Sequence, residues 1–171
     1  YWDNLDFQPW FGDANNDGCR DVLISSYRPG IPTTGRINIF FGETWDAAAA
    51  FEVLLSFEGR FSSVSFVYLD ADEIMDIVVF ISDQDGTNFR TQFLPGLGDG
   101  AYGSATQIID SQGEGQHWSD VDADGNLDLT RTKSAADSFE LLLGDGMGNF
   151  VLYDTYVLAP QACFVWMRDL N

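Results

Sequence analysis

Oxygen-bearing side chains recur at alternate positions in two short loops of this sequence. The loops run over residues 13–21 and 120–128, and each has Asp or Asn at positions 1, 3, 5 and 9 and Gly at position 6. Carboxylate and amide oxygens are hard ligands of the kind that Ca²⁺ prefers. Carboxylates that converge repel one another unless a divalent cation neutralises them. The pattern therefore predicts a calcium site in each loop.

The spacing also predicts which atoms bind the cation. Glycine at position 6 allows the left-handed turn that directs the odd-numbered side chains inward, and position 7 then offers its backbone carbonyl. In the first loop the predicted ligands are Asp13, Asn15, Asp17, Asp21 and the carbonyl of Cys19. In the loop at 120–128 they are Asp120, Asp122, Asp124, Asp128 and the carbonyl of Asn126.

A loop between these two departs from the pattern. Residues 68–76 keep Asp70, Asp72 and Asp76, but Tyr68 stands at position 1 and Glu73 replaces the glycine. We expect this second loop to have lost its cation site. Tyr68 is expected to pack into the core, with the remaining carboxylates facing solvent or capping turns.

Two other kinds of calcium loop can be compared with the sequence. An EF-hand needs a bidentate Glu at position 12 between two helices. Position 12 is Ile24 in the first loop and Arg131 in the loop at 120–128, and both lie in apparent strands. Tandem Gly-Gly nonapeptides are absent from the sequence as well. Both of these alternatives are therefore excluded.

The loops belong to a longer internal repeat. They start at positions 13, 68 and 120, with a fourth start at Asp169, so the steps are 55, 52 and 49 residues. In each unit an aromatic stretch precedes the loop and an apolar run follows it. A further strand then ends in Gly42, Gly96 or Gly144, and another strand closes the unit. Four short strands in about fifty residues is the format of a propeller blade.

This format predicts an all-β fold, a β-propeller built of four-stranded antiparallel blades, with about three blades in this chain. We expect one domain over 1–171, with repeats at 8–60, 61–112 and 113–162 and the start of a fourth at 163–171. A ring needs about four to eight blades. The chain is therefore expected to form an incomplete ring that further blades, other copies or an open stack extend.

The motif Asp-x-Asn/Asp-x-Asp-Gly-x-x-Asp before a strand, with a later strand ending in Gly, resembles FG-GAP or VCBS repeats. Such repeats form the propeller of integrin alpha subunits and occur in many secreted bacterial and fungal proteins. The resemblance implies an extracellular or cell-surface module with structural Ca²⁺, which binds a protein or glycan ligand and is not an enzyme. A subunit of an extracellular fibre or sheath, and a lectin or accessory module of a polysaccharide-acting enzyme, are the alternatives.

The charge of the chain restricts its partners. There are 27 acidic and 8 basic residues, which gives a formal net charge of −19. Such a field disfavours nucleic acid and anionic membrane surfaces. No apolar run approaches the ~18 residues that a membrane span needs. His117 is the single histidine, and no catalytic set accompanies it.

Two further expectations concern single residues. Cys19 and Cys163 either form one disulfide in an oxidising compartment or remain free thiols. The tryptophans that precede the loops are expected in the blade cores, whereas those outside the repeated strands are candidates for a contact surface. The first group is Trp10, Trp118 and Trp166, and the second is Trp2 and Trp45.

Overall fold

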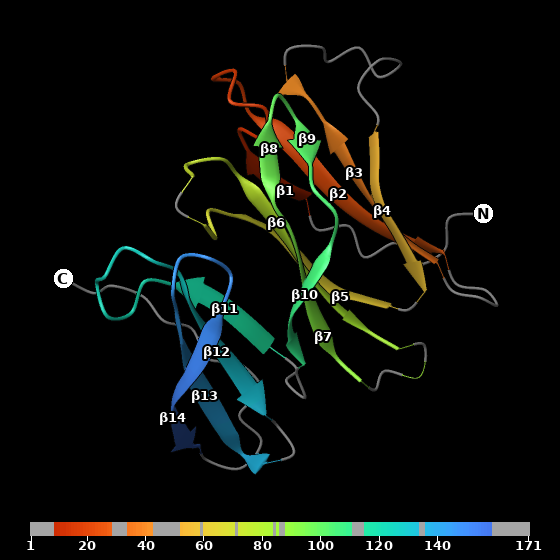
Figure 1. Cartoon of the computed structure of the whole chain (residues 1–171). Helices are drawn as coiled ribbons and strands as arrows, with labels where there is room; N and C mark the ends of the chain where they lie inside the picture. Colours follow the sequence, from red (N-terminus) through yellow and green to blue (C-terminus); the bar gives the residue numbers. More distant parts are fainter. Residues whose placement is uncertain are drawn as a thin grey trace.

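The computed structural model describes residues 9–28, 34–42, 52–58, 60–70, 72–83, 85, 88–110, 115–133 and 136–158. Three four-stranded antiparallel sheets make up most of this part of the chain (Figure 1). The first sheet comprises β1 (Pro9–Gly12), β2 (Asp21–Arg28), β3 (Thr34–Phe40) and β4 (Glu52–Glu58). The second comprises β5 (Arg60–Val67), β6 (Asp76–Ser82), β7 (Arg90–Leu94) and β10 (Thr106–Asp110). The third comprises β11 (Gly115–Ser119), β12 (Asp128–Lys133), β13 (Ser138–Gly144) and β14 (Phe150–Val157).

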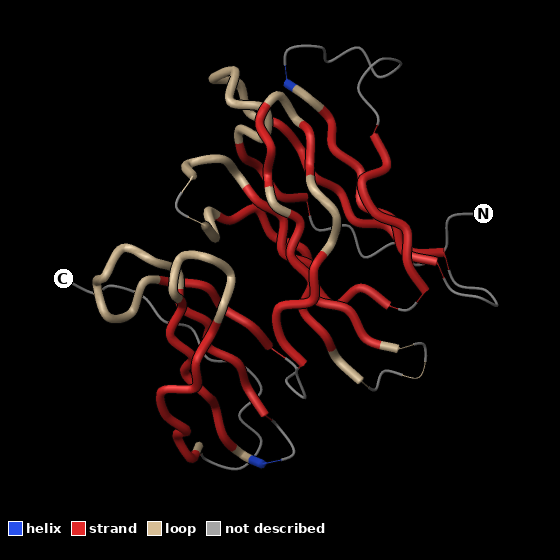
Figure 2. Tube along the Cα trace, in the orientation of Figure 1, coloured by secondary structure: helices blue, strands red, loops and turns tan. Residues whose placement is uncertain are grey.

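Each of the three sheets has the same order. Within each sheet, strands that follow one another along the chain are hydrogen-bonded neighbours, as in β1-β2-β3-β4 and β11-β12-β13-β14. Between β7 and β10 of the second sheet, the chain forms a separate two-stranded ribbon of β8 (Gly96–Gly98) and β9 (Ala101–Tyr102). Figure 2 shows mostly strands and loops with short helical pieces in blue, and the described residues contain no α-helix. The predicted all-β fold with four-stranded antiparallel sheets is confirmed.

The sheets stack face to face, and β6 shows why. All seven residues of this strand, DIVVFIS, are buried. Side chains alternate between the two faces of a strand, so Ile77 and Val79 pack with Leu23 of the first sheet. Val78 packs on the other face with Phe93, and Trp118 of the third sheet joins that cluster. The second sheet therefore lies between the other two.

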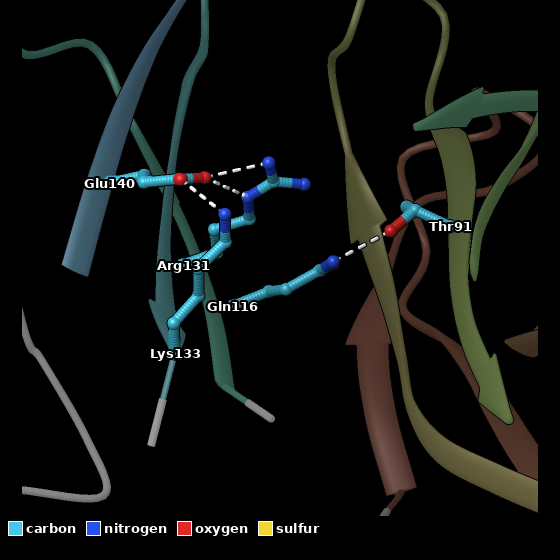
Figure 3. A network of polar contacts seen from close by, with 5 residues as sticks. All are labelled: Thr91, Gln116, Arg131, Lys133 and Glu140. Carbon is cyan, nitrogen blue, oxygen red and sulfur yellow. Dashed lines mark hydrogen bonds and ion pairs between the residues drawn. The ribbon is translucent and has the colours of Figure 1, made fainter. Parts of the chain in front are cut away.

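The third sheet also holds a polar network on the face toward the second sheet (Figure 3). Glu140 on β13 pairs with both Arg131 and Lys133 of β12, and the Arg131 Nη2 lies 2.6 Å from Glu140 Oε2. Burial alone would raise the pKa of Glu140, but hydrogen bonds from the two cations lower it overall. Beside this network, Gln116 Nε2 donates to Thr91 Oγ1 at 2.6 Å and links β11 to β7.

Two expectations about aromatic residues need correction. Trp10 was expected in a blade core, yet it is 36% exposed, because β1 is an outer strand whose residues Pro9–Phe11 all face solvent. Tyr68 was expected to pack inward, yet it is 52% exposed. Trp118 does lie in the core between the second and third sheets, as predicted. Trp2, Trp45 and Trp166 lie outside the described residues.

The described sheets do not form a closed ring, so the propeller stays a prediction. Within this same part of the chain, no helix has the length and hydropathy that crossing a membrane requires.

Candidate metal centre

The loop at 120–128 brings three of its predicted ligands together. It joins the end of β11 at Ser119 to the start of β12 at Asp128. Asp120, Asp122 and Asp124 each place a carboxylate oxygen within 4.8 Å of the others, and all three residues are exposed. Oxygens that bind one Ca²⁺ at about 2.3–2.6 Å lie at most about 5 Å apart. The three side chains could therefore hold a single metal ion.

Backbone hydrogen bonds fold this loop around its acidic side chains. Asp122 Oδ1 accepts from the N–H of Asp124 at 3.1 Å, and Asp124 Oδ1 accepts from the N–H of Asn126 at 2.8 Å. Asp120 Oδ2 accepts from Gly125 N at 3.1 Å. Gly125 has a φ of 93°, which is the left-handed turn expected at position 6. Each acid thus fixes the backbone two or five residues further on.

The first loop repeats this hydrogen-bond pattern position by position. Asn15 Oδ1 accepts from Asp17 N at 3.3 Å, Asp17 Oδ1 accepts from Cys19 N at 2.6 Å, and Asp13 Oδ2 accepts from Gly18 N at 2.9 Å. The bond from the Cys19 N–H holds the pKa of Asp17 below its ordinary value. This loop has one carboxylate fewer, because Asn15 stands where the other loop has Asp122.

The second loop keeps part of the turn without the first ligand. Asp70 Oδ1 accepts from Asp72 N at 3.2 Å, and Asp72 Oδ1 accepts from Ile74 N at 2.8 Å. Glu73 takes the left-handed conformation with a φ of 61°, although it has a side chain. The half-exposed Tyr68 offers no carboxylate at position 1. Asp70 and Asp72 cap turns, as expected, whereas Asp76, for which the same was expected, is fully buried.

The aspartate at loop position 9 is buried and accepts backbone hydrogen bonds that the sequence did not predict. Asp21, Asp76 and Asp128 are at most 1% exposed. In each, Oδ2 accepts from the backbone N–H of loop position 2, at 2.7–2.8 Å from Ala14, Leu69 or Val121. In each, Oδ1 accepts from the glycine that ends the third strand or follows it, at 2.7–2.9 Å from Gly42, Gly96 or Gly144. We call these three residues the latch aspartates, because each ties its loop to a distant strand end.

The glycine partner of each latch is required by close packing. A Cβ at Gly144 would lie 2.1 Å from the carbonyl oxygen of Leu127, the residue just before the latch Asp128. Gly42 and Gly96 meet the carbonyl oxygens of Arg20 and Met75 in the same way, at 2.4 and 2.5 Å. Only glycine lets the two backbone segments approach closely enough for the latch bond to form.

The latch bonds give the aspartate at loop position 9 a structural role. Asp21 and Asp128 were predicted as calcium ligands, and Asp128 is not part of the acidic group around Asp120. Both carboxylate oxygens of each already accept backbone N–H groups, so their observed contacts are structural. A recurring pairing of this Asp with a glycine 21, 20 or 16 residues later is the sequence signal that could have revealed the role.

The remaining predicted ligands are backbone carbonyls, at Cys19 and Asn126. The N–H of each donates to the aspartate at position 5, which fixes the orientation of the peptide before it. Cys163 lies outside the described residues, so the choice between a disulfide with Cys19 and two thiols stays a prediction. No protein-family model matches the chain, and no curated protein matches it at a significant level.

Proposed function

We propose that the chain is a calcium-binding repeat module of the FG-GAP or VCBS type, and that its Ca²⁺ is structural. The observation that carries the proposal is the convergence of Asp120, Asp122 and Asp124 within 4.8 Å in an exposed loop. Three carboxylates this close repel one another in water, and a bound divalent cation removes that cost. The first loop supports the proposal through its matching hydrogen bonds.

The site suits calcium better than magnesium. Mg²⁺ requires near-ideal octahedral geometry and keeps several waters, whereas Ca²⁺ accepts six to eight oxygens in flexible arrangements. A loop that supplies three carboxylates and a backbone carbonyl at alternate positions suits the flexible oxygen coordination of Ca²⁺. The ion would join the end of β11 to the start of β12, and its effect would be on the stability of the third sheet.

The proposed setting is extracellular, with a protein or glycan ligand at a cell surface and no catalytic reaction. The net charge of −19 supports a solvated, cation-rich environment and disfavours nucleic-acid partners. The face-to-face stacking of sheets with one strand order supports a propeller to which further blades are added. The resemblance in the loops supports adhesion or ligand binding as the biological role.

Isothermal titration of the calcium-free protein with CaCl₂ tests this proposal. We expect two binding sites, one per complete loop, and a tenfold or larger loss of affinity at one of them in Asp122→Ala. Asp154→Ala is the matched control, because Asp154 is an exposed acid on β14 outside the loops. Heat signals that are equal in the wild type and Asp122→Ala, or none in either, would contradict the proposal.

A further inference from the structure

The last strand of the third sheet is exposed along almost its whole length. Within the described residues β14 is an outer strand that pairs with β13 alone (Figure 1), and seven of its eight residues are exposed. Five of these are large and apolar or aromatic, with exposed fractions from 39% to 86%: Val151, Leu152, Tyr153, Tyr156 and Val157. Alternate residues of such a strand direct their backbone N–H and C=O groups away from the sheet. The strand β14 is therefore an open edge to which another strand can add.

The exposed apolar side chains of β14 lie on both faces of the sheet. Cross-strand partners share a face, and the partners on β13 place Val151 and Tyr156 on one face and Leu152 and Val157 on the other. A protein that docked on one face of the sheet would cover only half of these side chains. A strand added beside β14 contacts both sets, so the exposure fits edge pairing better than face-to-face docking.

A bulge in the middle of β14 makes this strand match an antiparallel copy of itself. Leu141 pairs with Asp154 and Leu142 with Leu152, so Tyr153 is an extra residue between them. The two residues of a bulge oppose one residue of the neighbouring strand, which places Tyr153 and Asp154 together opposite Leu141. The order of faces along the eight residues is then the same from either end. Two such strands can pair antiparallel with every pair of opposite side chains on one face.

The distribution of charge also favours this stretch as the place where two copies meet. Two chains that each carry a formal net charge of −19 repel one another. Charged residues make up 20% of the sequence, yet residues 146–167 contain a single one, Asp154. Repulsion between two copies is therefore weaker at β14 than at a part of the surface with the average density of acids.

The other outer strands are poorer partners for β14. The strand β11, at the opposite edge of the same sheet, is half-buried along its whole length. The strand β1 has four residues, and it begins with Pro9, which has no N–H to donate. Among the outer strands whose burial the structure describes in full, β14 alone combines eight residues with an open edge. The best-matched partner of β14 is therefore β14 of a second copy.

We propose that two copies of this chain pair antiparallel through β14, about a two-fold axis between Tyr153 and Asp154. Val151 of each copy then lies opposite Tyr156 of the other, which is a β-branched and aromatic pair of the kind that stabilises sheets. Asp154 lies opposite Tyr153, so the single charge does not meet its own copy. The two-fold contact uses both open edges, and the assembly stops at a dimer. It goes beyond the proposed calcium role and needs no metal, so it is expected in calcium and in chelator alike.

Light scattering coupled to size exclusion tests the dimer in the full chain. The wild type should have twice the mass of the 19.0 kDa chain. Val151→Asp and Val157→Asp each add a second charge to the paired strand, and each should raise the dissociation constant of the dimer at least tenfold. Leu97→Asp is the matched control, since Leu97 is 62% exposed on β8, outside the third sheet. All three side chains are exposed, so each variant should keep the wild-type circular dichroism spectrum.

Hydrogen–deuterium exchange measures the strand pairing itself. The amides of β14 should exchange more slowly as the concentration of the wild type rises, whereas those of Val151→Asp should not. A wild type that is monomeric at all concentrations overturns the proposal, as does a dimer whose β14 amides gain no protection. Larger polymers, or a dimer that Leu97→Asp weakens as strongly as Val151→Asp does, overturn it too. Since the experiments run in both calcium and chelator, a failure of calcium binding cannot imitate any of these results.

Discussion

Replacement of the latch Asp76 by alanine is expected to lower the free energy of unfolding by about 3 kcal/mol. The carboxylate is fully buried and accepts the backbone N–H groups of Leu69 and Gly96 at 2.8 and 2.7 Å. Alanine leaves both donors inside the protein without an acceptor, at a cost of about 1–3 kcal/mol each. The substitution also removes the free-energy cost of burying the charged carboxylate, and this gain offsets part of the loss.

Urea denaturation in chelator measures the effect without any contribution from calcium. Asp72→Ala is the matched control, because Asp72 is an exposed aspartate of the same loop. Its loss should be below about 1 kcal/mol. If the two variants unfold at the same urea concentration, the latch is not the connection that the hydrogen bonds indicate.

The latch also predicts a pH dependence. Burial raises the pKa of Asp76 to about 6, above the ordinary carboxyl value, despite the backbone hydrogen bonds that lower it. The folded state therefore binds this proton more tightly than the unfolded state, and the stability gained is lost as the pH rises through about 6. The difference in stability between the wild type and Asp76→Ala should accordingly be larger at pH 5 than at pH 7.5. A stability difference between the two proteins that is smaller at pH 5 than at pH 7.5 would contradict this prediction.

Removal of calcium is expected to produce the second large effect. A ligand at about 100 times its dissociation constant stabilises the folded state by about 2.7 kcal/mol. In a chain of this size that corresponds to a rise in melting temperature of about 5–10 °C. Asp124→Ala should lose most of the rise from the loop at 120–128, because Asp124 is one of the three converging carboxylates.

Thermal unfolding of the wild type and Asp124→Ala, each in excess calcium and in excess chelator, measures this effect. The two proteins should melt at similar temperatures in chelator and separate only in calcium. Asp154→Ala should follow the wild type in both buffers. An equal loss in chelator would mean that Asp124 acts only through its hydrogen bonds to Asn126.

The strands and loops of this protein could be predicted from local sequence signals. The glycines at position 6, Gly18 and Gly125, take the left-handed conformation that the pattern requires. The aromatic residues before each loop and the apolar runs after it do form neighbouring antiparallel strands, as Trp118 and Leu129 illustrate. These features depend on residues within about ten positions of one another, where turn chemistry and alternation decide the structure.

The role of position 9 could not be predicted in the same way. Asp128 looks like a further ligand in the sequence, because nothing local distinguishes an exposed carboxylate from a buried one. Its partner Gly144 lies 16 residues away across two strands, and only the folded sheet brings the two together. The exposure of Trp10 was missed for a related reason. Trp10 lies opposite Leu23, whereas Trp118 lies opposite Leu129, so Trp10 stands one position away from the place that Trp118 has in its sheet, and only the pairing of the strands reveals this.

Crystals grown in calcium, with anomalous diffraction data collected at a long wavelength, test the central claim most directly. We expect an anomalous peak enclosed by the carboxylates of Asp120, Asp122 and Asp124, about 2.3–2.6 Å from an oxygen of each. The latch carboxylate of Asp128 should still accept the N–H groups of Val121 and Gly144. A calcium-soaked crystal with an accessible loop and no peak among these three residues would contradict the account.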